Sequence, residues 1–420
     1  MRVPVLWLSR HPDTILARGY ADQGLLEGIL DRTVWRPPDP IEFAHREVRS
    51  DEPWGSEGAL VVLPARHHAS SRDLGWFRQR LDRLPWSVVL LSGDEEWAFP
   101  WHLIRENERR RVWTMQPIPP HAQLAGMIPG GWYPRTRELL APCAEEAANR
   151  PLDWFFAGQV THARRQACAA QLRGLGGGRL EESAGYLQEA VSRADYFRLL
   201  AGAKVAPCPS GPITVDTARA FEALEAGCVP VLDARHPGRG PQFDYWQLLF
   251  GEHPLPTIQE WEEFPGVLAR ELDAWPGNAN RAFAFWQRYK RRLAHELDAS
   301  IRAAAGNLPL FSVEPDDLIT VVVTTSPVAR HPLTDHLEQT LLSIREQLPD
   351  AEVVLAADGI RPEQEEWRAQ YEEYLRRVLW LSNFEFRNTA PVLLDEWGHQ
   401  ANTARAALQL VTTPLVLFVE

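Results

Sequence analysis

A strand, a loop, a helix and a second strand follow one another in the segment Ala206–Asp233, which reads APCPSGPITVDTARAFEALEAGCVPVLD. The loop carries Ser210 and Gly211, where the backbone can approach a ligand closely. Asp216 or Thr217 stands where the helix needs an N-cap. The free N–H groups and positive dipole end of such a helix favour a diphosphate. The segment therefore predicts an anion-binding loop at the carboxyl end of a strand.

Two charged residues of this helix, Arg219 and Glu222, are three positions apart and project from nearly the same face. Arginine can fork onto phosphate oxygens, and a carboxylate can accept hydrogen bonds from a ribose diol. The alternative is a plain surface ion pair between the two, which is a common and weak arrangement. The surrounding loop favours a ligand that carries phosphate at one end and sugar hydroxyls at the other.

The same string resembles the exostosin family, glycosyltransferase family 47. That family carries D-x-x-R-x-x-E-A followed by G-C-V-P-V-I, and the matching positions here are Asp216, Arg219, Glu222, Ala223, Gly227, Cys228, Val229, Pro230 and Val231. Upstream, four further pieces of the family correspond to Phe155–Gly158, the pair Arg164 and Arg165, Tyr186, and Ala203–Cys208, which contains Lys204. The resemblance covers about Leu152–Leu232, with its pieces in order.

This resemblance implies a GT-B fold, in which the second of two Rossmann-like domains holds a nucleotide sugar. It implies that Arg164 or Arg165 contacts the diphosphate and that Glu222 contacts the ribose or the sugar. The rest of the expected donor site is Lys204, Ser210, Gly211, Thr217 and Arg219. Inverting transfer without an essential metal is the family expectation. One departure stands out: Pro209–Pro212 replaces the family's Arg–Gly loop, so that basic residue is absent here.

An inverting transferase needs a general base within reach of the acceptor hydroxyl, and in GT-B enzymes the first domain generally supplies it. Candidates lie just beyond expected strand ends: His11, Asp13, His67, His68, Asp94, Glu95 and Glu96. Of these, Glu95 and His67 are our candidates for the base. The alternatives are a solvated acidic loop at Asp94–Glu96 and a loop contact or metal ligand at His67–His68, although no third ligand at suitable spacing supports a metal.

Short apolar strands alternate with helical patterns along the chain, which is the sign of parallel α/β layers. We predict the α/β class with three parts: an N-terminal Rossmann-like acceptor-side domain over residues 1–151, a donor domain over 152–307 and a partial GT-A unit over 316–420. The predicted strands are Val3–Leu8, Ala59–Pro64, Ser87–Ser92, Trp154–Ala157, Lys204–Cys208, Val229–Leu232, Leu318–Thr325, Glu352–Ala357 and Leu415–Val419. The predicted helices are Gln23–Leu30, Asp73–Leu84, His162–Gly174, Thr217–Ala226, Ile258–Trp275, Asn280–Ala305, Thr334–Leu348 and Glu363–Leu379.

The third part resembles the start of family 2 transferases, which have the GT-A fold. In that family an aspartate after the second strand binds the nucleotide base, and Asp358 occupies that place. Leu415–Glu420 resembles the strand that leads into the acidic metal-binding motif. We therefore expect a longer, two-transferase polypeptide, in which Mg²⁺ or Mn²⁺ belongs to a complete GT-A domain. The alternative is a small accessory α/β domain.

Composition excludes several classes of protein. The net charge of −12 disfavours a nucleic-acid binder. The basic run Arg109–Arg111 is expected to be a solvated helix end. The cysteines form no C-x-x-C pair, so neither a zinc site nor a redox motif is indicated. No apolar run approaches the ~20 residues of a membrane span, and we expect a cytoplasmic protein, with peripheral membrane association left open.

The expected function is transfer of a sugar from a nucleotide sugar to a glycan, protein or lipid-linked acceptor. The second candidate is a GT-B module that binds a glycan or partner without catalysis, which the altered loop Ser210–Pro212 favours. The set Arg164, Arg219 and Glu222 favours the enzyme. A nucleotide-sugar epimerase or phosphorylase of GT-B shape is a third candidate.

Overall fold

The structure is a computed structural model of the chain. It describes residues 1–9, 25, 28–29, 41–49, 52–64, 75–93, 99–104, 106–115, 117, 125–132, 136–140, 150–183, 185, 190–235, 243–306, 319–325, 340–341, 343–344, 351–358, 384–389 and 415–419. The chain forms three parallel sheets and divides into two compact units, Met1–Pro309 and Leu310–Glu420. The predicted α/β class is therefore confirmed.

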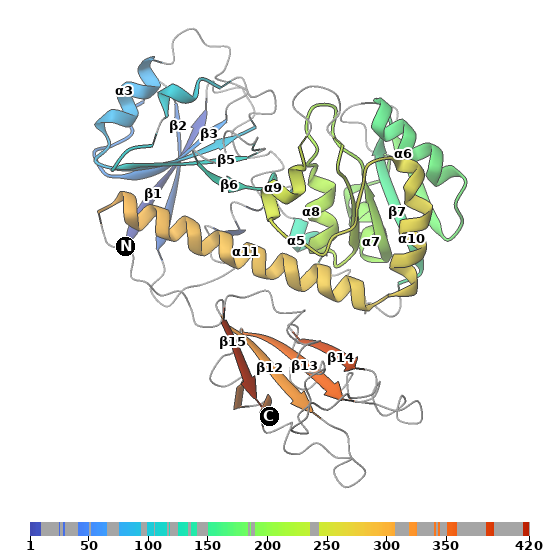
Figure 1. Ribbon diagram of the computed structural model, residues 1–420. Helices are drawn as coiled ribbons and strands as arrows, with labels where there is room; N and C mark the ends of the chain where they lie inside the picture. Colours follow the sequence, from blue (N-terminus) through green and yellow to red (C-terminus); the bar gives the residue numbers. More distant parts are fainter. Residues whose placement is uncertain are drawn as a thin grey trace. The chain divides into compact units, whose positions relative to one another are not determined.

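The first sheet has the strand order β2-β1-β3-β4-β5-β6 (Figure 1). Its strands are β1 Arg2–Ser9, β2 Glu42–Arg49, β3 Ala59–Pro64, β4 Ser87–Ser92, β5 Arg110–Met115 and β6 Gly126–Ile128. Every residue of β3 and β4 is buried, as expected for central strands of a parallel sheet. The strand predictions at Val3–Leu8, Ala59–Pro64 and Ser87–Ser92 are confirmed, and helix α3, Gly75–Arg83, lies within the predicted Asp73–Leu84.

The prediction of a helix end at Arg109–Arg111 is wrong, because the last two residues of this run begin strand β5. Arg110 is buried and donates to Asp82 at 2.8 Å, and Arg111 donates to the carbonyl of Asn107 at 2.6 Å. A charge run indicates a solvated helix end only when nothing nearby can pair with it, and here Asp82 at the end of α3 supplies the partner.

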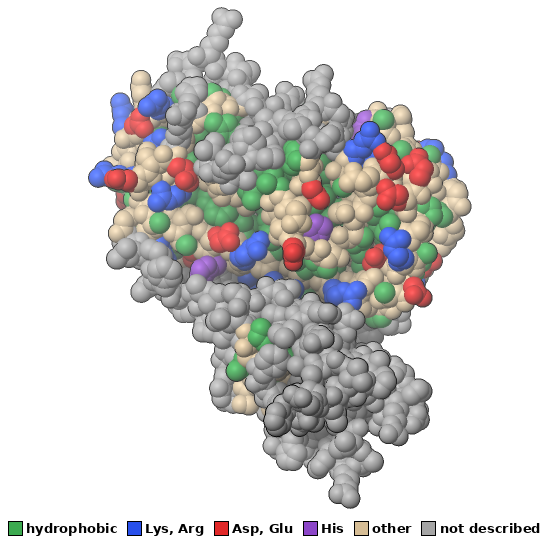
Figure 2. Space-filling model, viewed as in Figure 1, with side chains coloured by type: hydrophobic (Ala, Val, Ile, Leu, Met, Phe, Trp, Pro, Cys, Tyr) green, Lys and Arg blue, Asp and Glu red, His purple; other side chains and the backbone are tan. Residues whose placement is uncertain are grey.

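On the face drawn in Figure 2, the described basic and acidic side chains are interspersed.

The second sheet has the strand order β11-β10-β9-β7-β8. Its strands are β7 Leu152–Gln159, β8 Gly178–Ser183, β9 Ala203–Cys208, β10 Val229–Asp233 and β11 Thr257–Ile258, with helices α6 Ala163–Arg173, α7 Arg193–Ala201 and α8 Ala218–Glu225 between them. Read from β7, this is the doubly wound order 2-1-3-4-5, so the order reverses between β7 and β9. Ligands of such sheets bind at the carboxyl ends of the strands beside the reversal.

The remaining helices of the first unit include one that contacts both of its sheets. They are α5 Thr136–Leu140, α9 Tyr245–Phe250, α10 Phe264–Asp273 and the 28-residue α11 Gly277–Ala304. Helix α11 contacts β4 and β5 of the first sheet and α8 and β10 of the second (Figure 1). The helix predicted for this part of the chain is therefore confirmed. The single helix predicted over Ile258–Trp275 is wrong at its start, because Ile258 ends β11 and a capping box between Glu260 and Glu263 begins a 3₁₀ turn, Trp261–Glu263, before α10.

The second compact unit contains β12 Ile319–Thr325, β13 Glu352–Asp358, β14 Phe384–Thr389 and β15 Leu415–Val419, in the order β14-β13-β12-β15. All three of its strand predictions are confirmed. Residues 340–341 and 343–344 are helical, as predicted, while Glu363–Leu379 lies outside the described residues. None of the helices in the described part of the chain is long and apolar enough to span a membrane.

Candidate functional site

Two helices begin at the carboxyl edge of the second sheet, beside the reversal of strand order. Helix α6 follows β7 with His162 as its N-cap, and α8 follows β9 with Thr217 as its N-cap. Both N-cap residues have extended backbone, at φ −136° and −135°, and neither side chain caps its helix. The first N–H groups of both helices therefore lack a side-chain cap, which is the arrangement that binds anions at helix N-termini.

Four buried polar atoms at this edge have no hydrogen-bond partner among the described residues: His162 Nε2, Ser210 Oγ, Thr217 Oγ1 and Arg219 Nε. Ser210 is fully buried. Buried polar atoms in folded proteins are nearly always paired, so a group of exceptions needs a physical explanation. Unpaired polar atoms at the ligand-binding edge of a doubly wound sheet are suited to a polar ligand.

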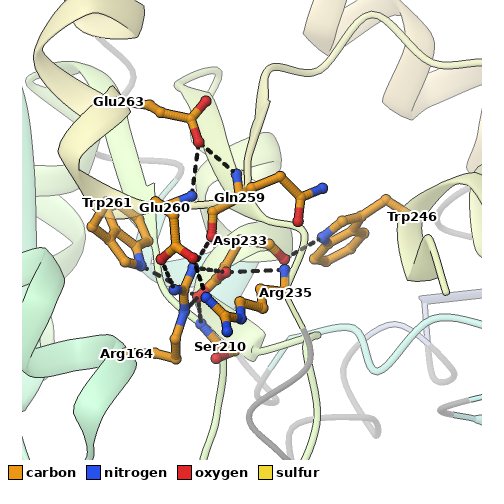
Figure 3. Close-up of polar contacts among 9 residues, drawn as sticks. All are labelled: Arg164, Ser210, Asp233, Arg235, Trp246, Gln259, Glu260, Trp261 and Glu263. Carbon is orange, nitrogen blue, oxygen red and sulfur yellow. Dashed lines mark hydrogen bonds and ion pairs between the residues drawn. The ribbon is translucent and has the colours of Figure 1, made fainter. Parts of the chain in front are cut away.

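A fully buried carboxylate, Asp233 at the end of β10, organises the loops around this edge (Figure 3). Arg164 donates to it twice, from Nε at 3.1 Å and from Nη2 at 2.7 Å. The backbone N–H groups of Ser210 and Arg235 donate to it at 3.2 Å each, and the indole of Trp261 donates at 3.3 Å. One side chain therefore fixes the positions of the segments after β9, β10 and β11.

Arg164, one of the two arginines expected at the diphosphate, is held by these acidic neighbours. Besides Asp233, it donates to Glu260 Oε2 at 2.8 Å and to the carbonyl of Gln259 at 2.6 Å. Its side chain is 11% exposed. Burial opposes its charge, but the bonds to Asp233 and Glu260 outweigh that effect and raise the pKa of Arg164. Its guanidinium is therefore committed to protein carboxylates.

Arg165, the other arginine, lies at the reversal of strand order itself. It is buried, and its guanidinium donates to the carbonyls of Ser210 and Gln159 at 3.4 Å each. These carbonyls follow β9 and end β7, respectively. Arg165 therefore contacts the loop that carries Ser210 directly, whereas Arg164 is joined to it through Asp233.

Arg219 reaches from the first turn of α8 across the end of β7. Its Nη2 donates to the carbonyl of Ala157, and its guanidinium carbon lies 4.3 Å from the ring centroid of Phe156. Gly158 has φ +153°, and a Cβ built there would overlap Arg219 Nη2. Glycine is favoured at this position because the positive φ strains any L side chain, and a Cβ would also require the guanidinium of Arg219 to shift.

Glu222 lies deeper than the sequence suggested. It is 5% exposed and accepts from the hydroxyl of Tyr196, on α7, at 2.9 Å. Burial raises the pKa of Glu222, while the bond to Tyr196 and the charges of Arg193 and Arg219 act against that rise. No contact in the described part of the chain joins Arg219 directly to Glu222, so the simple surface pair considered above is not formed there.

The remaining predicted residues fall in different places. The amide of Gly211 donates to the carbonyl of Thr214 at 2.8 Å, which closes the turn beside Ser210. Lys204 is at the amino end of β9 and donates to Asp153 at 2.8 Å, so it lies at the opposite edge of the sheet. Glu95, His67 and Tyr186 lie outside the described residues. Asp358 ends β13 in the second compact unit.

Comparison of the chain with protein-family models gives no match. A search among curated proteins likewise gives none. Among the described residues, no group of three or more histidine, cysteine or acidic side chains is placed to hold a metal ion.

Two residues of this edge had no role in the sequence analysis. Asp233 closes an otherwise apolar strand, and a carboxylate in that position, which folding must bury, was the available signal. His162 was predicted as the first residue of a helix, whereas in the structure it is the N-cap of α6, a position where histidine is not typical. Burial, reinforced by Arg165 and opposed by Asp233, lowers the pKa of His162 to about 4, so its imidazole is neutral at pH 7.

Proposed function

We propose that the carboxyl edge of the second sheet is the donor site of a glycosyltransferase that uses a nucleotide sugar. The observation that carries this proposal is the group of buried, unpaired polar atoms on His162, Ser210, Thr217 and Arg219, at the reversal between β7 and β9. A nucleoside diphosphate supplies the many acceptor oxygens that such a group needs. The order of motifs resembling the exostosin family supports the same assignment.

Within this proposal, each residue takes a distinct role. Arg165, Arg219 and the N-termini of α6 and α8 bind the diphosphate, with Ser210 and Thr217 donating hydroxyl hydrogen bonds. Arg164 holds Asp233 and is not itself a ligand contact. Glu222 contacts the ribose or sugar through its second oxygen, because a carboxylate that accepts from Tyr196 on one oxygen keeps acceptor sites on the other.

The proposed reaction is inverting transfer. The acceptor hydroxyl attacks the anomeric carbon, a base takes its proton, and the nucleoside diphosphate leaves. Helix N-termini and two arginines offset the charge that develops on the leaving diphosphate, so no metal has a required part in this step. Glu95 and His67 remain the candidates for the base. The GT-B arrangement of the two Rossmann-like sheets, a cytoplasmic location and a glycan, protein or lipid-linked acceptor complete the proposal.

For the second compact unit, we propose a sheet of the GT-A type. Its strand order, read from β12, is 3-2-1-4, which matches the first four strands of a doubly wound sheet. Asp358 ends the second strand of that order, at the carboxyl edge where a nucleotide base would bind. A complete domain of this kind would use Mg²⁺ or Mn²⁺ to neutralise the leaving diphosphate.

The second candidate function is a binding module without catalysis. The commitment of Arg164 to Asp233 and Glu260 favours it, because a family arginine is thereby withdrawn from the donor. Such a module would bind a glycan or partner and would not release nucleoside diphosphate. Turnover therefore separates the two candidates.

The test is calorimetric and thermal-shift titration of the full chain with UDP-, GDP-, TDP- and CMP-sugars, with and without EDTA. We expect one nucleotide sugar to bind saturably in EDTA, and Arg219→Ala to weaken it by at least about tenfold. The matched control is Arg173→Ala at the far end of α6, where the partner of Arg173 among the described residues is the exposed Glu182. Absence of binding by all four donors, or equal loss in both variants, would refute the donor site.

A further inference from the structure

The carboxylate of Asp216 joins three separate segments of the first compact unit. Its Oδ2 atom accepts from the hydroxyl of Tyr245 at 2.7 Å and from the backbone N–H of Gly130 at 3.1 Å. Asp216 is buried and directly precedes Thr217, the N-cap of α8. Tyr245 is the first residue of α9, and Gly130 follows β6 of the first sheet. One oxygen therefore connects the start of α8 to α9 and to the first sheet.

Two features of the surrounding structure are consistent with this contact. A Cβ built on Gly130 would lie 3.1 Å from Asp216 Oδ2, which is tighter than an ordinary contact. The next residue of α9, Trp246, donates to the backbone carbonyl of Asp233 at 3.0 Å. The first turn of α9 therefore holds both the start of α8 and the end of β10.

The side chain of Asp216 has a different task from the one expected of an N-cap. Thr217 is the N-cap of α8, while Asp216 lies one position outside the helix and bonds to Tyr245 and Gly130 instead. Its negative charge is still favourable there, because it stands at the positive end of the helix dipole. The contact consequently sets where the N–H groups of α8 point.

We propose that Asp216 is a positioning residue that fixes the N-terminus of α8 and couples it to the segment after β6. The effect of Asp216 on ligand binding rests on the proposed function. The coupling between the two segments does not depend on that function. Because coupling between two sites acts in both directions, a ligand bound at the N-terminus of α8 also protects the segment that contains Gly130.

The test compares Asp216→Ala with Asp216→Asn in the full chain. Both bonds go to one oxygen, and an amide oxygen also has two lone pairs, so Asn can keep both bonds while Ala loses them. The matched control is Asp244→Ala, which removes the exposed N-cap of α9, bonded to the amide of Gln247 at 2.9 Å. The readouts are amide hydrogen exchange and calorimetric affinity for UDP and GDP.

We expect Asp216→Ala to speed exchange together in residues 125–132 and 209–220, and Asp216→Asn to restore exchange close to that of the wild type. Asp244→Ala should speed exchange in α9 alone. For whichever of UDP and GDP the wild type binds, Asp216→Ala should weaken affinity about tenfold and Asp216→Asn about twofold or less.

Two outcomes would overturn the proposal: exchange that rises only in residues 209–220 in Asp216→Ala, or unchanged affinity in that variant. If the wild type binds neither UDP nor GDP, these two donors are excluded, which is a separate matter from the coupling. The exchange data then decide the coupling on their own, because they need no ligand.

Discussion

Arg164 donates hydrogen bonds to both carboxylate oxygens of Asp233, at 2.7 and 3.1 Å, although the two residues are 69 positions apart in the sequence. Asp233 is fully buried, and the Arg164 side chain is nearly so. Removing one partner of a buried ion pair leaves the other charge uncompensated, which costs about 3–5 kcal/mol. We therefore predict that Asp233→Asn lowers the free energy of unfolding by about that amount, measured by urea denaturation.

Glu260 provides the control for this prediction. It pairs with the same arginine, but its side chain is 47% exposed. An exposed ion pair contributes at most about 1 kcal/mol, so Glu260→Gln should have a small effect. Equal losses in the two variants would show that burial of Asp233 is not what makes its contact important.

Ser210→Ala should separate stability from ligand binding. The hydroxyl of Ser210 is buried without a partner among the described residues, and such a group costs about 1–3 kcal/mol of desolvation. Its removal should leave the melting temperature of the ligand-free protein unchanged or raise it. The same variant should weaken nucleotide-sugar affinity about fivefold to tenfold, measured by calorimetry. A lower melting temperature with unchanged affinity would assign the hydroxyl to the fold instead of the ligand.

The imidazole of His162 should make stability depend on pH in a specific window. Its pKa is about 4 in the folded protein and 6.5 in the unfolded chain. Between these values the unfolded chain binds a proton that the folded protein does not, so the free energy of unfolding falls as pH drops from 6.5 to 4. His162→Gln should remove this part of the slope and change little at pH 8.

Imidazole NMR gives a direct check of the same residue. The His162 signals should titrate near pH 4 without ligand, and a bound diphosphate should move the midpoint upward, because a nearby negative charge favours the protonated ring. A ligand-free midpoint at or above pH 6 would contradict the prediction.

The strands that the sequence predicted are mostly those with an apolar run. Among those it missed, β2, β6, β8, β11 and β14 lie at the edges of their sheets. An edge strand is free to carry charged and polar residues, and β2 reads EFAHREVR. Hydrophobic periodicity therefore had no signal there. Strand β5 is the exception, because it is an inner strand that was not predicted. The arginines at its start interrupt the apolar pattern.

The candidate site was predictable only in part, for a related reason. A strand, a glycine loop and a helix start can be read locally, and they placed Ser210, Thr217 and Arg219 at one edge. The choice between Arg164 and Arg165 depends on Asp233, which lies far away in the chain. Adjacent helical residues face different directions, so only the fold shows which arginine the carboxylate takes.

A second buried ion network should limit stability in acid. Glu225, in the last turn of α8, accepts from Lys290 and from Trp286 of α11, and from Arg137 of α5 at 2.9 Å. Burial acts to raise the pKa of Glu225, but Lys290 and Arg137 outweigh burial and lower it below 4.5. Its stabilisation is therefore complete above pH 4.5 and is lost as pH falls through the folded pKa.

Glu225→Gln tests this network, because it leaves Lys290 fully buried beside Trp132 and Trp286 without its carboxylate. We expect a loss of about 3–5 kcal/mol at pH 7, and a smaller loss at pH 3, because below pH 4.5 the unfolded chain binds a proton at Glu225 and the carboxylate then stabilises the wild type less. Urea denaturation at both pH values gives the comparison. Glu182→Gln, which breaks only the exposed pair with Arg173, should cost at most about 1 kcal/mol at either pH. An equal loss in Glu225→Gln at pH 3 and pH 7 would show that the carboxylate charge does not stabilise the contact between α8 and α11.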